Sequence, residues 1–271
     1  MIIYQPKGRA REYSPLAANL YKGCDHGCIY CYVPRILRMD KQKFRESVTP
    51  KKDIIKQVTD QVSKWKGPKE QVLLSFTGDP YCKAETTQFI TRASLQMLLL
   101  TDFPVAILTK GGSRCLRDLD IFTTYKDQIK VGATLTFIKE LMTQAFEPYS
   151  AGPQERLDTL KILHENGIRT WVSFEPVICP DQTIELLNRT LEYVDEYKIG
   201  KINQFENMDK GIDWKDFLQE AVIMLRRHDK DFYVKQDLRE QAPEIWLTHK
   251  EKYMDALTLQ PTAALSKLTI P

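Results

Sequence analysis

The sequence lacks any apolar run long enough to cross a membrane. A spanning helix needs about 20 mostly apolar residues, and the longest uninterrupted aliphatic run, around Met97–Leu100, is far shorter. Residues 1–6 show no basic stretch followed by an apolar one, so we expect no secretory signal. The 271-residue chain has no Gly/Ser-rich linker or repeat, and its 42% hydrophobic content excludes disorder as the main state. We therefore expect a folded, cytoplasmic protein without a membrane partner.

An excess of one charge sign is also missing from the chain as a whole, where 39 basic and 36 acidic residues leave a net charge of +3. The distribution is uneven, however. Residues 1–52 hold eleven Lys/Arg and four Asp/Glu, a net +7, and the remaining residues carry a net −4. A basic block of this kind indicates either a face that binds polyanions or an ordinary solvated surface.

Cysteines are few, and their pattern does not suggest disulfides, which are rare in cytosolic chains. Cys82, Cys115 and Cys179 are isolated in the sequence. For Cys115 and Cys179 we expect buried structural thiols.

The other three cysteines fall within eight residues, as Cys24, Cys28 and Cys31. Closely spaced thiolates select zinc or iron–sulfur centres. Structural zinc needs four ligands, and the fourth would have to be His26 or a distant cysteine, because no second Cys-x-x-Cys pair exists. This spacing suits a [4Fe–4S] cluster better, with three irons held by the protein and one left open.

Apolar segments typical of strands alternate with segments of helical periodicity along most of the chain. The predicted strands cover 16–21, 72–77, 105–109, 129–136, 168–174, 199–205 and 232–236. The predicted helices cover 51–66, 86–100, 113–125, 154–166, 182–197 and 214–227. This alternation predicts an α/β fold with a parallel sheet, formed as an open or partly closed barrel. Residues 241–271 are weakly patterned, and we treat them as a C-terminal extension to a core of residues 1–240.

Polar residues recur where the predicted strands end. In parallel α/β sheets, ligands bind at the carboxyl ends of the strands. Several sets of polar side chains converging on one rim would suit a buried cofactor and substrate. The sets are Thr77-Gly78-Asp79, Thr109-Lys110, Thr134 with Thr136, Ser173 with Glu175, and Asn203-Gln204.

The cysteine segment, Tyr21–Pro34, resembles the cluster loop of radical S-adenosylmethionine (SAM) enzymes. More narrowly, it resembles the spore photoproduct lyase-like branch, which is related to DNA repair photolyases. The segments 76–81, 108–110 and 151–157 are also similar to that branch, and the resemblance covers about residues 14–240. It implies a partial (β/α)6 radical SAM barrel.

The resemblance also implies roles for individual residues around the SAM molecule. Cys24, Cys28 and Cys31 would ligate the [4Fe–4S] cluster, and SAM would chelate its fourth iron. Tyr30 would lie near the adenine, and Thr77, Gly78 and Asp79 would occupy the place that binds the SAM amino group. Candidate partners of the SAM carboxylate are Lys110 and Arg156, of its ribose or methionine part Thr134 and Thr136, and of the adenosine or substrate Glu175. Each of Asp79, Lys110, Arg156 and Glu175 also has an ordinary structural interpretation, as a turn or surface residue.

The reaction implied by the family begins when a one-electron reductant such as flavodoxin or ferredoxin reduces the cluster. SAM is then cleaved to a 5′-deoxyadenosyl radical that abstracts hydrogen from the substrate, while the protein supplies position and excludes water. The branch implies a nucleic-acid base as substrate, in lesion repair or DNA modification. Side chains that would stack on a base, or pack in the core instead, are Tyr32, Tyr81, Tyr149 and Trp171.

The sequence departs from the lyase at one important position. The lyase has a hydrogen-donating cysteine two residues before the Ser-Asp pair that matches Gly78-Asp79, and this chain has Phe76 there. Cys82 lies three residues after Asp79 and is the candidate replacement. We expect Cys82, Tyr81 and Glu175 to be the catalytic residues. The hypotheses are therefore a lesion-repair lyase or an isomerase acting on a modified pyrimidine, a radical SAM enzyme for a peptide or small metabolite, and a non-catalytic metal-binding module.

Overall fold

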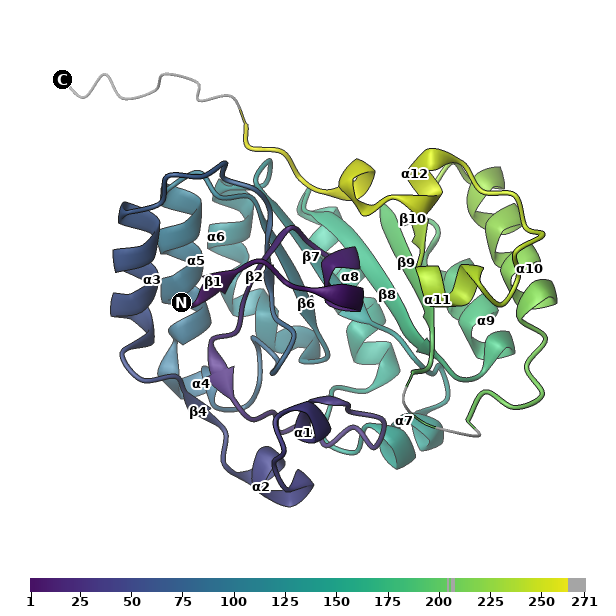
Figure 1. Cartoon of the computed structure of the whole chain (residues 1–271), viewed down its shortest axis with the longest axis horizontal. Helices are drawn as coiled ribbons and strands as arrows, with labels where there is room; N and C mark the ends of the chain where they lie inside the picture. Colours follow the sequence, from purple (N-terminus) through teal and green to yellow (C-terminus); the bar gives the residue numbers. More distant parts are fainter. Residues whose placement is uncertain (204, 206–207, 263–271) are drawn as a thin grey trace.

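The fold is built on an eight-stranded sheet in the order β1-β2-β5-β6-β7-β8-β9-β10 (Figure 1). The computed structural model describes residues 1–203, 205 and 208–262. Neighbouring strands from β2 to β10 run parallel, and only β1 pairs antiparallel, with β2 at one edge. The strands are β1 (Ile3–Tyr4), β2 (Leu16–Ala18), β5 (Val72–Leu74), β6 (Val105–Thr109), β7 (Ile129–Thr134), β8 (Arg169–Val177), β9 (Glu196–Lys201) and β10 (Asp231–Val234). The predicted α/β class and partial parallel barrel are confirmed.

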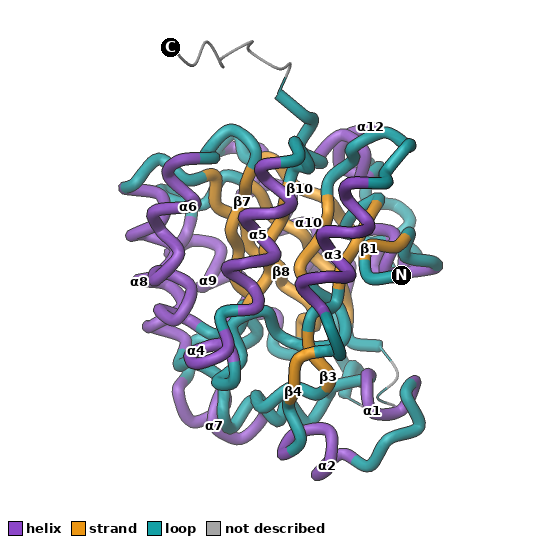
Figure 2. The backbone as a smooth tube through the Cα atoms, turned by 90° about the vertical axis from the view of Figure 1, so that its left-hand side faces the viewer, coloured by secondary structure: helices purple, strands orange, loops and turns teal. Residues whose placement is uncertain are grey.

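Helices form a layer outside the strands, as Figure 2 shows. The longer ones are α3 (Ile54–Ser63), α5 (Ile90–Leu100), α8 (Pro153–Glu165), α9 (Pro180–Thr190) and α10 (Trp214–Arg227). Shorter helices are α1 (Val33–Ile36), α2 (Lys41–Glu46), α4 (Glu85–Gln88), α6 (Leu119–Thr124), α7 (Glu140–Phe146), α11 (Gln236–Arg239) and α12 (His249–Lys252), with 3-10 turns at Gly8–Glu12, Gly112–Asp118 and Met254–Leu257. In the described ranges, no helix has both the length and the apolar character needed to span a bilayer.

Both faces of the central strands are buried, which explains why these strands read as continuous apolar runs in the sequence. Two large hydrophobic clusters lie between strands and helices. A smaller cluster lies on the inner face and includes Tyr13, Ala17, Leu73, Ala106 and Trp171. The inner face therefore receives a side chain from the segment before the first parallel strand.

A cluster of buried ionisable side chains lies on the inner face of the sheet, and Lys130 and Glu196 belong to the amino ends of their strands. Lys130 donates to both oxygens of Glu196 at 2.9 and 2.7 Å and to the carbonyl of Leu257 at 2.7 Å. Lys198 donates to the carbonyl of Tyr13 at 3.0 Å. These contacts fasten the C-terminal segment and the N-terminal segment to the same end of the sheet.

Several predicted boundaries are wrong for local physical reasons. The segment predicted as one helix over 86–100 is divided at Phe89, whose φ of 53° is left-handed. The segment predicted as a helix over 182–197 ends at Thr190, and β9 begins at Glu196, whose backbone is in register with Trp171 of β8 and Asp231 of β10. Gln204 lies outside the described residues.

Candidate active site

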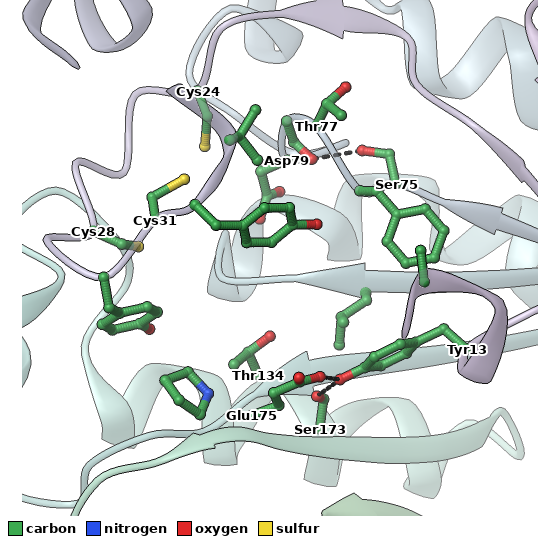
Figure 3. Close-up of a pocket in the computed structure, with 18 of the residues that line it drawn as sticks. Tyr13, Cys24, Cys28, Cys31, Ser75, Thr77, Asp79, Thr134, Ser173 and Glu175 are labelled. Atoms are coloured by element: carbon green, nitrogen blue, oxygen red, sulfur yellow. Dashed lines mark hydrogen bonds between the residues drawn. The ribbon is translucent and has the colours of Figure 1, made fainter. Parts of the chain in front are cut away.

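A cavity of about 700 Å³ lies at the carboxyl ends of the strands. Figure 3 shows the cysteines at one end of it and Tyr13, Ser173 and Glu175 at the other. Its described lining comes from the cysteine loop, from the ends of β5 to β10, and from residues 4–13 before the first parallel strand. Most of the polar side chains predicted at the strand ends therefore line one cavity; Thr136 is not part of the described lining, and Gln204 lies outside the described residues.

The cysteine loop is held by backbone hydrogen bonds to distant segments. The amide of Cys24 donates to the carbonyl of Phe44 at 3.0 Å, and the amide of Ile29 donates to the carbonyl of Phe146 at 2.9 Å. Gly23 has a φ of +84°, and a Cβ there would lie 2.6 Å from the Phe44 oxygen. Glycine is thus required where the loop passes closest to α2.

Cys24, Cys28 and Cys31 all line the cavity as free thiols. Burial raises the pKa of each of them, and for Cys28 to about 12. Without a metal these thiols are therefore protonated, and a bound cation would displace the protons. Three soft donors on one tight loop fit an iron–sulfur cluster with an open position, and Figure 3 shows their sulfurs facing the same space.

Asp79 is buried and fully engaged with the protein. Its carboxylate accepts hydrogen bonds from the Thr109 hydroxyl at 2.6 Å and the Lys110 amide at 2.7 Å, and His26 Nε2 lies 3.0 Å away. Burial alone would raise the pKa of Asp79, but His26 and these hydrogen bonds outweigh burial and hold it well below its usual range. Asp79 thus ties the cysteine loop to the end of β6, and Thr77 and Gly78 line the cavity beside it.

The two cations considered for the SAM carboxylate have different surroundings. Lys110 lines the cavity, with its ammonium 5.6 Å from the centroid of the Tyr30 ring. Arg156 is 1% exposed and donates to the carbonyls of Ala151 and Thr134 at 2.9 Å each and to Glu147 at 2.5 Å. Of these two cations, Lys110 is among the described residues that line the cavity, and Arg156 is not.

Tyr30 and Thr136 both contact Glu147. Tyr30 donates its hydroxyl hydrogen to Glu147, which also accepts from Thr136 at 3.2 Å. Burial raises the pKa of Glu147, and Arg156 partly offsets that effect. Tyr30 and Thr134 line the cavity, whereas Thr136 is buried behind them and is not part of the described lining.

Glu175 belongs to a polar network at the end of the cavity opposite the cysteines. It accepts from Lys235 at 2.6 Å and from the Tyr13 hydroxyl, and Tyr13 lies 2.7 Å from the Ser173 hydroxyl. Burial, together with Glu175, raises the pKa of Tyr13 well above its ordinary value. Neither Tyr13 nor Lys235 was predicted from the sequence as a site residue. Lys235 directly follows β10, so it could have been predicted from the tendency of ligands to bind at the carboxyl ends of parallel strands. Nothing in the sequence around Tyr13 indicates its role.

Tyr81 and Cys82 are not brought into the described lining of the cavity. Tyr81 is buried and donates its hydroxyl to Asp118 at 2.9 Å, while its amide donates to Asp79 at 2.8 Å. Cys82 is completely buried. Cys115 is buried as expected, but Cys179 is only partly buried.

The four aromatic candidates for stacking are also separated. Tyr32 lines the cavity, as does Phe76 at the position where the lyase has its cysteine. Tyr149 lies on the surface, 45% exposed, with Arg45 5.1 Å from its ring. Trp171 is a core residue, fully buried, and donates its indole hydrogen to the Ile107 carbonyl at 2.9 Å.

The chain belongs to the radical SAM superfamily, because the sequence model of that superfamily matches residues 18–194, more than half of the chain. It is an enzyme family that uses a [4Fe–4S] cluster and SAM. The residues described above fit that pair: three thiols, a neighbouring cation and a tyrosine line one cavity.

The chain is similar in sequence to one of the following proteins and in fold to the other two. An uncharacterised protein of Methanocaldococcus jannaschii is 27% identical over 204 residues, which is 74% of each chain. A mutant of spore photoproduct lyase has a TM-score of 0.65 at 14% identity, covering 86% of this chain and 78% of that one. Streptococcus suis SuiB, bound to its precursor peptide SuiA, has a TM-score of 0.50 at 15% identity, covering 66% of this chain and 42% of that one. The chain therefore spans less than half of SuiB.

Proposed function

We propose that this radical SAM enzyme acts on a nucleic-acid base, either as a lyase that repairs a lesion or as an isomerase of a modified pyrimidine in DNA. The observation that supports this proposal is the cavity itself, which has the cluster cysteines at one end and the basic side chains Lys7 and Arg9 along its wall. The likeness to spore photoproduct lyase, which extends over 86% of the chain, supports the same substrate class.

When bound, the cluster and SAM supply a 5′-deoxyadenosyl radical that abstracts a hydrogen atom from the substrate. The protein's part is to hold the reactants in register and to exclude water. In this proposal Cys24, Cys28 and Cys31 hold the cluster, and Lys110 neutralises the SAM carboxylate. Thr77 and Gly78 place the amino group, with Asp79 fixing the loop on which they lie.

The remaining residues divide between SAM and the substrate. Tyr30 and Thr134 lie near the adenosine part. Glu175 faces the substrate in this proposal, and its orientation is fixed by Lys235 and Tyr13. Arg156 and Thr136 act indirectly, because both hold Glu147, the acceptor of the Tyr30 hydroxyl.

Cys82 and Tyr81 were predicted to take part in catalysis, and for both this stays a prediction. Cys82 directly follows Tyr81 in the loop that Asp79 begins, and it is completely buried. If Cys82 returns a hydrogen atom to the product radical, Cys82→Ala will raise the proportion of by-products. An unchanged product profile in the variant would remove Cys82 from the mechanism.

The proposed function is tested under anaerobic conditions. The protein is reconstituted with iron and sulfide and reduced, SAM is added, and 5′-deoxyadenosine is quantified with and without DNA. Stimulation by DNA, with deuterium passing from labelled DNA into 5′-deoxyadenosine, is the expected result. Cleavage of SAM that DNA does not change would contradict the nucleic-acid proposal and favour a peptide or small-metabolite substrate, the alternative to which the likeness to peptide-bound SuiB points.

Two further parts of the proposal concern the cell and the chain. The six free cysteines and the cluster suit the reducing cytoplasm, where flavodoxin or ferredoxin would donate the electron.

Residues 1–240 would carry the catalytic core. The extension from residue 241 would cover the end of the sheet opposite the cavity, through the contact between Lys130 and Leu257.

A further inference from the structure

The mouth of the cavity carries exposed apolar side chains directly after the last cysteine. Ile36 and Leu37, at the end of α1, are 56% and 49% exposed, and Tyr32 is 38% exposed. Tyr32 and Ile36 also line the cavity. Figures 1 and 2 show that α1 and α2 project from the end of the molecule where the cysteine loop lies. Two adjacent, exposed aliphatic side chains at the rim of a reaction cavity are typical of a surface that a binding partner covers.

Positive charge surrounds this apolar pair. Arg35 and Arg38 flank it in the sequence, Lys41 follows at the start of α2, and all three are exposed. On α2, Arg45 pairs with Glu46. No ion pair occupies Arg35, Arg38 or Lys41 within the part of the chain that the structure describes. Lys41 also lies 5.9 Å from the centroid of the Phe205 ring, but none of the three cations is neutralised by a carboxylate, and each can bind a phosphate.

We propose that Ile36 and Leu37 form an apolar wedge that fills the base stack when the target base turns out of a DNA duplex into the cavity. In this proposal Arg35, Arg38 and Lys41 bind the flanking phosphates. The proposal rests on the proposed function, because only a nucleic-acid substrate needs to be unstacked.

The geometry gives the wedge its physical reason. A base inside a duplex cannot reach a buried reaction centre, so enzymes that do chemistry on bases extrude them, and apolar side chains often take the vacated position. A residue that fills the vacated position has to lie next to the cavity and has to be accessible to the DNA. Ile36 meets both conditions, because it lines the cavity and is more than half exposed. A protein that only delivers electrons would cover the same surface without entering the cavity, so the cavity-lining position of Ile36 favours the substrate as the partner.

The test compares one thymine-containing oligonucleotide as a single strand and as a duplex, using the reconstituted holoenzyme. The readout is 5′-deoxyadenosine formation stimulated by each form of the DNA. In Leu37→Ala and in Ile36→Ala/Leu37→Ala, stimulation by the duplex should fall about tenfold, because the everted state loses its filler. Stimulation by the single strand should change less than about twofold, since no stack has to be opened. Leu100→Ala is the control, because Leu100 is 63% exposed at the end of α5.

Each other outcome overturns the wedge and identifies what failed. An equal loss of stimulation by the single strand and by the duplex would show that Ile36 and Leu37 contact DNA without opening its stack. Unchanged stimulation by the duplex would show that these two side chains do not contribute to DNA binding. A loss seen with flavodoxin but absent with dithionite would make this surface the docking site of the reductant. If neither DNA form stimulates the wild-type enzyme, while SAM is still cleaved, the proposed function fails and the wedge fails with it.

Discussion

At the residue scale, burial raises the pKa of all three loop thiols, so a metal has to take the place of their protons. Replacing Cys24, Cys28 or Cys31 by alanine should therefore abolish the iron–sulfur absorbance and lower the iron content of the reconstituted protein. Cys179→Ala is the matched control, because that thiol is partly buried but lies outside the loop. Full absorbance in any of the three loop variants would remove that cysteine from the ligand set.

Lys198 gives a second prediction at this scale, for stability against pH. Burial, reinforced by the nearby Lys130, lowers the pKa of Lys198 to about 7 in the folded protein. Between pH 7 and the ordinary lysine pKa, the unfolded chain binds a proton there that the folded protein does not, so this residue makes stability rise with pH. The Tm of the holoprotein should increase from pH 7 to 8.5, and Lys198→Met should flatten that increase. An identical pH profile in wild type and variant would contradict the lowered pKa.

At the scale of elements, Arg156 joins α8 to the end of β7 and to the loop that carries Glu147. Arg156→Met leaves Glu147 buried without its partner, so we expect a loss of about 3–5 kcal/mol in the free energy of unfolding. Lys110→Met should leave stability nearly unchanged and weaken SAM binding, because Lys110 faces the cavity. Denaturant unfolding and SAM titration of both variants separate the two roles. Weaker SAM binding with unchanged stability in Arg156→Met would return Arg156 to the cofactor site.

Helices and strands could be predicted where buried residues recur in a regular pattern along the chain. They could not be predicted where one local backbone conformation or contact sets the boundary. Strand β6 could be predicted because both of its faces are buried and it reads as an apolar run. The break at Phe89 could not, since its left-handed backbone has no sequence signal. Cys24, Cys28 and Cys31 could be singled out from the sequence, because they lie within eight residues of one another. Tyr13 was not, because its partners Ser173 and Glu175 lie about 160 residues further along the chain.

At the scale of the whole molecule, the net charge of +7 over residues 1–52 includes Lys7 and Arg9 in the cavity wall and Arg35 and Arg38 at its mouth. Each phosphate that the protein neutralises releases counterions, so DNA affinity falls with salt, with a slope of about −0.7 per contact for single strands. Arg35→Gln/Arg38→Gln should therefore reduce the magnitude of the salt slope by about 1.4 in a fluorescence-anisotropy titration of a labelled single strand. Lys56→Gln is the control, because Lys56 is exposed on α3 and already paired with Asp60 at 2.7 Å. A slope unchanged by the arginine substitutions would mean that the basic block is an ordinary solvated surface, the other interpretation of its sequence.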